Sequence, residues 1–375
     1  MRLTQRLQLI KLTVLVGLFA SIILSINLWA GQRFFPKASL MNQGYGVLAP
    51  YDYLQLGVLI ILIVLSFFSQ KKLPSLCLIL FSVYLCLDDQ NRMQPWFYNY
   101  ILILLILIFY KQRVDEPNNY TTIFISLQLL IASIYIFSGI QKMNSLFVPD
   151  TFNWMISSFD TILSKRQLNL LSKFGYIVPY FELCLGVFLL VKPLRFIVIP
   201  LVILMHISIL IMLGPLGKNY NAVVWPWNIT MIVLILLLFT NIKQERFFDI
   251  SFLFKSLSFY IVVLLMLILP IFSLNNTYDS YLSSSLYSSN LNNAQLILSD
   301  KSYNRLPYYI RHFVTKNEDY NILNIKYWAV QELKAPCVPE RRIFKSVQYY
   351  IIRLTRSDSV EVKLEFTERE KLLVF

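Results

Sequence analysis

Lys142, Glu182 and His206 are ionisable side chains that lie within or at the end of apolar runs. Such residues are costly at membrane depth and often have a function there. Desolvation disfavours the charged form of a lysine, so we expect Lys142 to take part in proton transfer, with Glu182 or His206 positioning it or taking up its proton. An ionised Glu182 in direct contact would oppose this role, because its charge would keep Lys142 protonated.

The elements that must position these residues are apolar runs long enough to cross a membrane. The chain has 375 residues, of which 57% are hydrophobic and 15% charged. A membrane-spanning helix needs about 20 mostly apolar residues to cross roughly 30 Å of hydrocarbon. We therefore expect an all-α polytopic membrane bundle of about nine helices, over residues 7–30, 53–68, 73–87, 97–110, 120–140, 177–191, 194–213, 222–240 and 257–274.

Positive charges lie mostly in alternate connections between these runs. The formal net charge of +13 would suggest nucleic-acid binding in a soluble protein, but the cytoplasmic excess of Lys and Arg explains much of it. We expect no nucleic-acid partner, an N-terminus inside and a C-terminus outside. An outer segment with Lys165, Arg166 and Lys173 departs from this bias. The inner connections carry Lys71, Lys72, Lys111, Arg113, Lys192, Arg195, Lys243, Arg246 and Lys255.

The composition changes after residue 275, where apolar runs give way to Ser, Asn and Tyr. We expect a helical transmembrane domain over residues 1–275 and a small extracytoplasmic domain over residues 276–375, α+β in class and rich in strands. Residues 360–366 alternate apolar and charged side chains, the period of a half-buried strand. Residues 346–355 are predicted to form its partner strand.

Two further features bear on the class of site. Residues 151–173 are too polar to span, and they form either a helix along the membrane interface or an ordinary packed loop helix. The four cysteines form no C-x-x-C pair. We therefore expect no dithiol site and no metal site, and we expect the cysteines to act as small hydrophobic residues.

The directions of the predicted spans place Lys142, Glu182 and His206 in the outer third of the membrane. The sequence predicts no comparable group of polar residues in the inner leaflet. Convergent polar groups in an apolar wall are the usual form of a small-molecule site. We expect additional residues near this level to bind a substrate: Asn221, Trp225, Asn228, Asp89 and Arg92.

Each of these residues also has a plainer interpretation. Lys142 could extend its ammonium group to the lipid headgroups, and His206 could be a neutral histidine that only makes a structural hydrogen bond. Trp225 fits an interfacial aromatic belt. Asp89 and Arg92 fit a solvated loop with an internal ion pair.

The segment from Tyr135 to Asn144 resembles the signature of the vitamin K-dependent gamma-carboxylase family. Its bacterial members are described as horizontally transferred transmembrane domain (HTTM) proteins. The shared pattern is an apolar helix with Tyr, then Gly139-Ile140-Gln141-Lys142, an apolar residue, and Asp or Asn. A helix carrying Glu, a basic turn and a helix carrying His follow, so that the likeness covers roughly residues 121–237. The resemblance implies that Lys142 is a base, that a quinone is the cofactor or substrate, and that the chain resides in a bacterial plasma membrane.

Two hypotheses of function follow. In the first, the chain is a membrane enzyme that acts on a lipophilic, quinone-like substrate in an outer-leaflet cavity, with Lys142 as the base. In the second, it is a non-catalytic membrane subunit or scaffold whose C-terminal domain binds a partner protein, and the polar residues only join helices. A cavity that reaches Lys142 favours the first, and direct pairing of Lys142 with Glu182 in a closed core favours the second.

Overall fold

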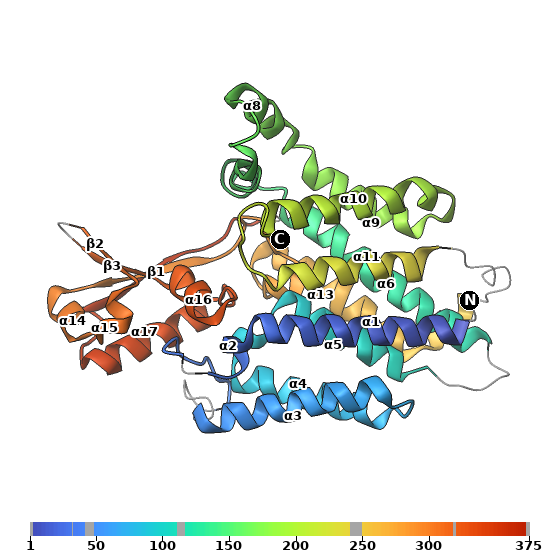
Figure 1. Ribbon diagram of the computed structural model, residues 1–375, viewed down its shortest axis with the longest axis horizontal. Helices are drawn as coiled ribbons and strands as arrows, with labels where there is room; N and C mark the ends of the chain where they lie inside the picture. Colours follow the sequence, from blue (N-terminus) through green and yellow to red (C-terminus); the bar gives the residue numbers. More distant parts are fainter. Residues whose placement is uncertain are drawn as a thin grey trace.

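The computed structural model describes residues 3–31, 33–41, 49–110, 117–240, 250–317 and 320–372. Within these ranges the chain is mostly helical, and a small antiparallel sheet lies at one end of a long helical bundle (Figure 1). We call the end of the bundle that faces the sheet the domain end, and the other the distal end. Four residues of the predicted inner connections, Lys111, Arg113, Lys243 and Arg246, lie outside the described residues.

Each of the nine predicted apolar runs contains helix in the described part of the chain. Consecutive helices run in opposite directions along the bundle (Figure 1). The helices are α1 (Leu3–Leu24) with the short α2 (Ile26–Trp29), α3 (Ala49–Phe68), α4 (Leu73–Asp88), α5 (Pro95–Ile108), α6 (Pro117–Gln141), α9 (Val178–Leu190), α10 (Arg195–Leu213), α11 (Val224–Phe239), and a last run of α12 (Leu257–Val262), a π-helical turn (Val263–Ile268) and α13 (Leu269–Phe272).

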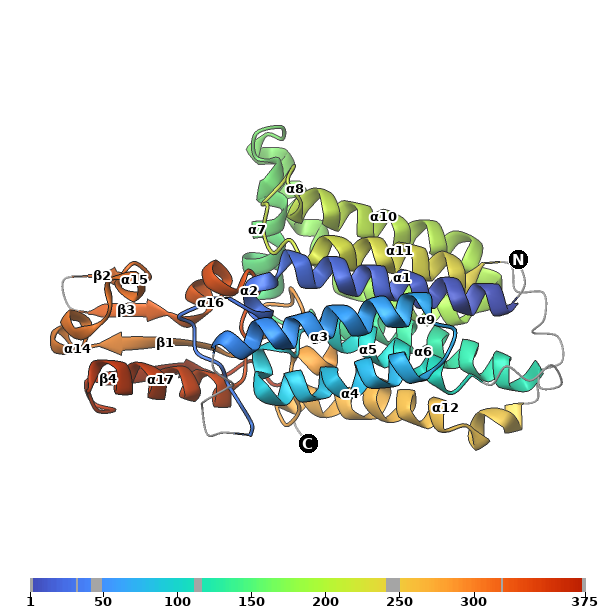
Figure 2. The same cartoon turned by 60° about the horizontal axis from the view of Figure 1, so that its bottom comes forward.

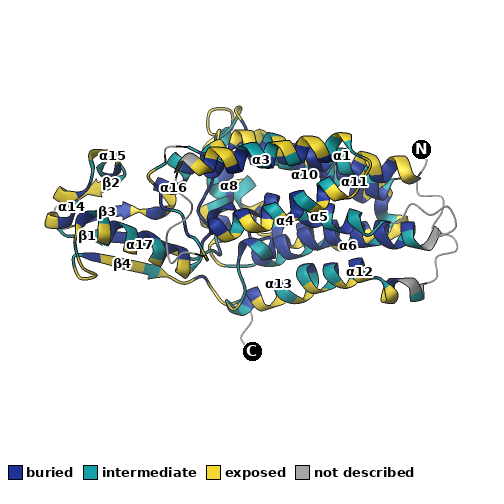
Figure 3. Ribbon diagram, turned by 90° about the horizontal axis from the view of Figure 1, so that it is seen from below, coloured by how far each residue is buried: buried dark blue, intermediate teal, exposed yellow. Residues whose placement is uncertain are grey.

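The count of membrane spans is only partly settled by length and composition. Within the described residues, five helices are long and apolar enough to cross a membrane, and α8 (Lys165–Phe174) with α9 adds a sixth if that pair, bent by 46°, is one span. The apolar helices α4, α5 and α11 are shorter. Leu80, Ile61 and Phe196 are examples of large apolar side chains that are exposed, at 62%, 57% and 75%. Exposed residues recur along the outer helices of the bundle (Figure 3), as a lipid-facing surface requires.

Helix α6 lies inside the bundle and packs against α9 at very close range (Figure 2). A Cβ atom on Gly139 of α6 would lie 2.6 Å from the backbone oxygen of Pro179, and one on Gly186 of α9 would lie 2.8 Å from the backbone oxygen of Ala132. Each glycine thus lets the backbone of the other helix approach. Small residues are the usual means of close helix packing where no water drives apolar surfaces together.

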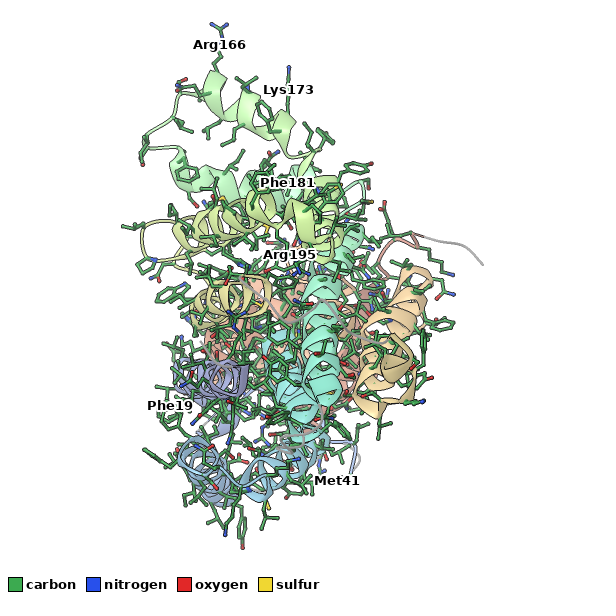
Figure 4. The ribbon with its side chains drawn as sticks, turned by 90° about the vertical axis from the view of Figure 1, so that its right-hand side faces the viewer. Phe19, Met41, Arg166, Lys173, Phe181 and Arg195 are labelled. Carbon is green, nitrogen blue, oxygen red and sulfur yellow. The ribbon has the colours of Figure 1, made fainter. Side chains whose placement is uncertain are left out.

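The segment between α6 and α9 is an arm of short helices that projects sideways from the domain end of the bundle (Figure 1). It comprises a π-helical turn (Phe147–Phe152), α7 (Asn153–Ile156), a 3-10 turn (Ser157–Phe159) and α8. Phe152, Met155 and Ile156 are buried against the bundle, whereas Ile162 is 78% exposed. Arg166 and Lys173 point away from the bundle (Figure 4). The arm is therefore packed at its base and free at its tip, rather than one continuous helix.

The C-terminal sheet has four antiparallel strands in the order β2-β3-β1-β4. Within the alternating pattern of residues 360–366, the strand prediction is confirmed from Val362 on, as β4, while residues 360 and 361 belong to a turn. The neighbour of β4 is β1, with Leu364 opposite Leu296. The strands are β1 (Asn293–Leu298), β2 (Val314–Lys316), β3 (Asn321–Asn324) and β4 (Val362–Thr367), and the helices of this domain are α14 (Asp300–Arg305), α15 (Tyr308–Arg311), α16 (Ile325–Leu333) and α17 (Arg341–Thr355).

The prediction of a strand at residues 346–355 is wrong, because this segment is the C-terminal part of α17. Its buried residues are Ile343, Phe344, Val347 and Ile351, which recur at the three- and four-residue spacing of one helix face. These side chains belong to the same apolar core as the sheet residues Leu296 and Val362. Packing of this apolar face on the sheet stabilises a helix here, although the composition of the segment favours a strand.

The C-terminal domain is hydrogen-bonded directly to the turn between α4 and α5. Gln94 donates to the carbonyl of Pro336 at 2.8 Å, and the backbone N–H of Val338 donates to the side chain of Asn91 at 3.3 Å. Arg342 of α17 donates to Gln90 at 2.6 Å. The two parts of the chain therefore form a joint in which polar side chains of the bundle are covered by the domain.

Substitution of Gly139 by Ala is expected to lower the free energy of unfolding by about 1–3 kcal/mol, the usual range for forcing a methyl group into a packed contact. Gly57→Ala in α3 is the matched control, since nothing lies within 4 Å of the methyl group that it adds, and it should leave stability unchanged or slightly raised. Thermal unfolding in detergent, followed by tryptophan fluorescence, measures both. Equal midpoints for the two variants would contradict the proposed role of Gly139 in packing.

Candidate functional site

A cavity of about 360 Å³ lies at the domain end of the bundle. Its walls come from α5, α6 with the residue after it, α9, α10 and α11, and from the base of the arm. Ser284, Leu286 and Tyr287 of the segment before β1 also contribute to its wall. Most of the lining is apolar, for example Ile134, Met205 and Met231. A mainly apolar cavity with a few polar groups is the usual form of a small-molecule site.

The first polar group in this cavity is an ion pair between Lys142 and Glu182. The ammonium Nζ lies 2.8 Å from Oε2 of Glu182, and each side chain is 11% exposed. Lys142 also donates to the hydroxyl and, at 3.3 Å, to the carbonyl of Ser138. The structure thus combines the two arrangements expected as alternatives, because Lys142 lines the cavity and is paired with the carboxylate.

The second polar group is a hydrogen-bonded chain across three helices. Tyr135 of α6 is 2.6 Å from Nε2 of His206 on α10, and Nδ1 of the same ring is 2.6 Å from Oδ1 of Asn228 on α11. The amide nitrogen of Asn228 donates to the carbonyl of Val224 at 2.7 Å. Oδ1 of Asn228 therefore accepts the Nδ1 proton, and Nε2 of a neutral His206 accepts the proton of the Tyr135 hydroxyl. All members of this chain are buried.

Tyr135 and Ser138 were not among the predicted site residues, yet both line the cavity. The sequence did hold a signal for them. Tyr135, Ser138 and Lys142 follow one another at spacings of three and four, which places them on one face of α6. The stripe lies at the C-terminal end of α6 and continues to Lys142 directly after it, where the other residues from Leu129 to Ile140 are apolar apart from Ser133.

The cavity wall between α9 and α10 includes side chains on the outside of the bundle. Phe181 of α9 is 37% exposed and Leu204 of α10 is 59% exposed, and both line the cavity. Phe181 lies on the side of the bundle from which the arm projects (Figure 4). A molecule dissolved in the surrounding lipid would therefore meet the cavity wall between these two helices.

Of the predicted substrate-binding residues, Asn228 lines the cavity, while Asn221 and Trp225 lie just behind the wall. Asn221 donates to the hydroxyl of Tyr287 at 3.3 Å, and burial raises the pKa of that tyrosine, which does line the cavity. The indole of Trp225 donates to the carbonyl of Leu213 at 3.4 Å. Among the described residues it is Trp227, two positions on, that forms part of the wall.

Arg92 lies in a separate, buried cluster of charges at the domain end of α3 and α4. Its side chain is 1% exposed, with Asp88 at 3.0 Å and Asp52 at 3.5 Å. It also donates to the backbone carbonyls of Trp29 at 3.1 Å and Leu85 at 3.2 Å. These contacts join four parts of the chain around one guanidinium group.

Asp89 belongs to the same cluster and is fully buried. It pairs with Arg33 and accepts hydrogen bonds from the backbone N–H groups of Ala38 and Asn91. Burial alone would raise the pKa of Asp89, but Arg33 and Arg92 outweigh burial and lower it. The interpretation of this segment as a solvated loop is therefore wrong, because residues 33–41 and the C-terminal domain cover it.

The cysteines show no dithiol arrangement. Cys77, Cys86, Cys184 and Cys337 are all unpaired, and burial raises the pKa of Cys337 to about 12. Within the described part of the chain, no group of three His, Cys, Asp or Glu residues is arranged to hold a metal ion.

Substitution of Arg92 by Met is expected to cost about 3–5 kcal/mol of stability, because it leaves buried Asp88 and Asp52 without their guanidinium partner. Lys301→Met is the matched control: its partner is Glu361, and the lysine side chain is 61% exposed, so little change is expected. Thermal unfolding in detergent compares the two. A shift for Arg92→Met no larger than that of the control would contradict a structural role for the cluster.

Comparison of the chain with known protein families, with curated proteins and with solved structures found no match. The candidate site therefore rests on its own geometry: an apolar cavity on which the Lys142–Glu182 pair and the Tyr135–His206–Asn228 chain converge.

Proposed function

We propose that this protein is an integral membrane protein that binds a lipophilic small molecule with a polar, hydrogen-bonding head group in the cavity at the domain end. The observation that carries the proposal is the convergence of Lys142–Glu182 and Tyr135–His206–Asn228 on one apolar cavity. A quinone is the class of ligand that fits best, since it combines an apolar ring and tail with carbonyl oxygens that accept hydrogen bonds.

The proposed topology has nine membrane spans, with the shorter helices α4, α5, α9 and α11 crossing alongside the five longer ones. The distal end faces the cytoplasm of a bacterial cell, and the C-terminal domain lies outside the plasma membrane. The described connections at the distal end carry several positive charges, in keeping with the positive-inside rule, namely Lys71, Lys72, Lys192, Arg195 and Lys255.

The two polar groups have different roles in the proposed site. Lys142 donates to an oxygen atom of the head group in place of its 3.3 Å contact with the Ser138 carbonyl. The Tyr135 hydroxyl, whose proton is directed to His206, lies in the wall of the same cavity, and the tail extends past Phe181 and Leu204 into the lipid. For Lys142 to act as a base, its proton must first move to Glu182, which leaves a neutral amine beside a carboxylic acid. Low polarity favours this neutral pair over separated charges. The resemblance of residues 135–144 to the gamma-carboxylase signature supports the role of a base.

A non-catalytic scaffold is the second candidate, and the direct contact between Lys142 and Glu182 favours it. A buried ion pair of this kind can hold two helices in register without any chemistry. In that case the C-terminal domain would carry the function by binding a partner protein outside the membrane.

A variant that fills the cavity tests whether the cavity is a binding site or only a structural void. Met205→Trp places a larger side chain in the cavity wall, whereas the matched control Ile207→Trp alters the same helix at a position that is 42% exposed and outside the lining. Mass spectrometry of lipids and quinones that co-purify with each protein gives the readout. We expect one lipophilic species to be enriched in the wild type and in the control, and reduced about tenfold in Met205→Trp, which corresponds to a loss of about 1.4 kcal/mol of binding free energy. Its absence from the wild type, or its full retention by Met205→Trp, would contradict the proposal.

Removal of the ion pair distinguishes the two candidate functions. Lys142→Met leaves Glu182 buried without a partner, which should cost about 3–5 kcal/mol of stability, whereas the double variant Lys142→Met/Glu182→Met should unfold near the wild-type temperature. If the pair serves the ligand, the stable double variant loses the co-purified species. If the pair serves only the scaffold, the double variant retains it.

A further inference from the structure

A second, smaller cleft lies at the distal end of the bundle, remote from the cavity described above. Its volume is about 160 Å³, and it is formed by the ends of α1, α4 and α5 and by the turn between α3 and α4. Lys11, Lys71 and Lys72 all line it. No acidic residue is among its lining side chains in the part of the chain that the structure describes. The charged side chains of the described lining are therefore all positive.

Lys11 is held at this cleft by a hydrogen bond. It lies on α1, and its ammonium group donates to the backbone carbonyl of Ser69 at 2.8 Å. This contact uses one of the three protons of the ammonium group and leaves the others for a ligand. Because Ser69 directly follows α3, the same bond fixes the turn that carries Lys71 and Lys72 beside α1.

Ser75 is an independent sign that the cleft receives a ligand. The residue is 5% exposed and lines the cleft, yet its hydroxyl oxygen has no hydrogen-bond partner among the described residues. Buried polar groups are nearly always paired, so an unpaired one calls for an explanation. A ligand with an acceptor oxygen in the cleft would satisfy this hydroxyl.

The start of α4 also points at the cleft. This helix has 16 residues and begins at Leu73, and its N-cap residue Lys72 makes no side-chain capping hydrogen bond. The first N–H groups of a helix have no partner within the helix, and together with the helix dipole they attract an anion. Lysines, a free hydroxyl and an uncapped helix start thus favour the same class of ligand, an anion with several acceptor oxygens.

The remaining walls of the cleft are apolar. Leu7, Leu104 and Leu107 line it on the side of the helices, and Thr4, Gln8 and Gln70 form a polar rim. A free anion needs no apolar wall, whereas the glycerol and acyl part of a phospholipid does. Basic pockets between the cytoplasmic ends of membrane helices are known to hold lipid head groups.

We propose that this cleft binds the phosphate group of an anionic phospholipid from the leaflet at the distal end. Lys11 and Lys71 pair with the phosphate, the Ser75 hydroxyl donates to one of its oxygens, and the acyl chains follow the apolar side chains of α1 and α5. This site is independent of the proposed function of the cavity at the domain end, because the two share no residue.

Native mass spectrometry of the full-length protein tests the proposal, with equimolar phosphatidylglycerol and phosphatidylcholine added to the delipidated protein in detergent. The test variant carries Lys11→Gln and Lys71→Gln. The control carries Lys326→Gln and Lys345→Gln, the same change of charge at exposed positions of the C-terminal domain.

We expect the wild type and the control to retain phosphatidylglycerol in preference to phosphatidylcholine, and the test variant to retain about tenfold less of it, as expected for the loss of two cation–phosphate contacts. Equal retention of the two lipids by the wild type, or unchanged retention of phosphatidylglycerol by the test variant, would overturn the proposal.

Two further measurements test whether binding needs the cleft as well as its lysines, and whether the ligand is a lipid or a free anion. Ser75→Leu keeps every lysine but fills the cleft, and it should lose phosphatidylglycerol as the test variant does; full retention would show that the lysines bind lipid without the cleft. Inorganic phosphate should not displace bound phosphatidylglycerol. If it does so at a concentration equal to that of the lipid, the ligand is free phosphate and the assignment to a lipid is wrong.

Discussion

The close contact between α6 and α9 is the constraint on which the candidate site depends. Gly139 and Gly186 let the two backbones meet at a distance that any side chain would prevent. Lys142 comes three residues after the first glycine, and Glu182 comes four residues before the second. Because the helices are antiparallel, this spacing brings the ammonium and carboxylate groups to the same level. A wider separation of the helices would leave each charge alone in apolar surroundings, at a cost of several kcal/mol.

The bundle contains two buried polar systems at its domain end, and they differ in what surrounds them. The cluster around Arg92 is closed, since its carboxylates face Arg33, Lys37 and Arg92 and the backbone of neighbouring segments takes up the remaining donors. The residues around Lys142 and His206 instead border a cavity. Satisfied networks without adjoining space specify structure, and polar groups beside space can receive a ligand. The two polar systems therefore differ in whether they border a cavity, and not in their charge.

The C-terminal domain contributes to both polar systems and is therefore more than an appendage of the bundle. Pro336 and Val338 cover the turn between α4 and α5, which takes the charged cluster out of contact with solvent. The segment before β1 brings Tyr287 to the cavity wall and joins the end of α6, where Asn144 donates to the carbonyl of Ser288 at 2.8 Å. The boundary near residue 275 is thus a change of composition rather than a gap between independent parts.

The sequence by itself determined where the helices of the bundle lie, because a run of apolar residues bounded by polar turns has few alternatives in or near a membrane. It also singled out Lys142, Glu182, His206 and Asn228 from the direction of each helix, since depth along alternating helices can be counted from residue numbers. It did not determine α17, whose strand-like composition yields to a helical face packed on a sheet that is distant in sequence.

Only the tertiary structure decided which polar residues meet. Asp89 and Arg92 were expected near the level of the cavity residues, yet they lie in the turn between α4 and α5, which packs against Arg33 and Asp52 in a different cluster. Tyr135 belongs to the site because α10 and α11 bring His206 and Asn228 to the face of α6 on which it lies. The depth of a residue follows from the rise per residue along its own helix. The direction in which its side chain points depends on how several helices pack around one another, and the sequence of one helix does not contain that information.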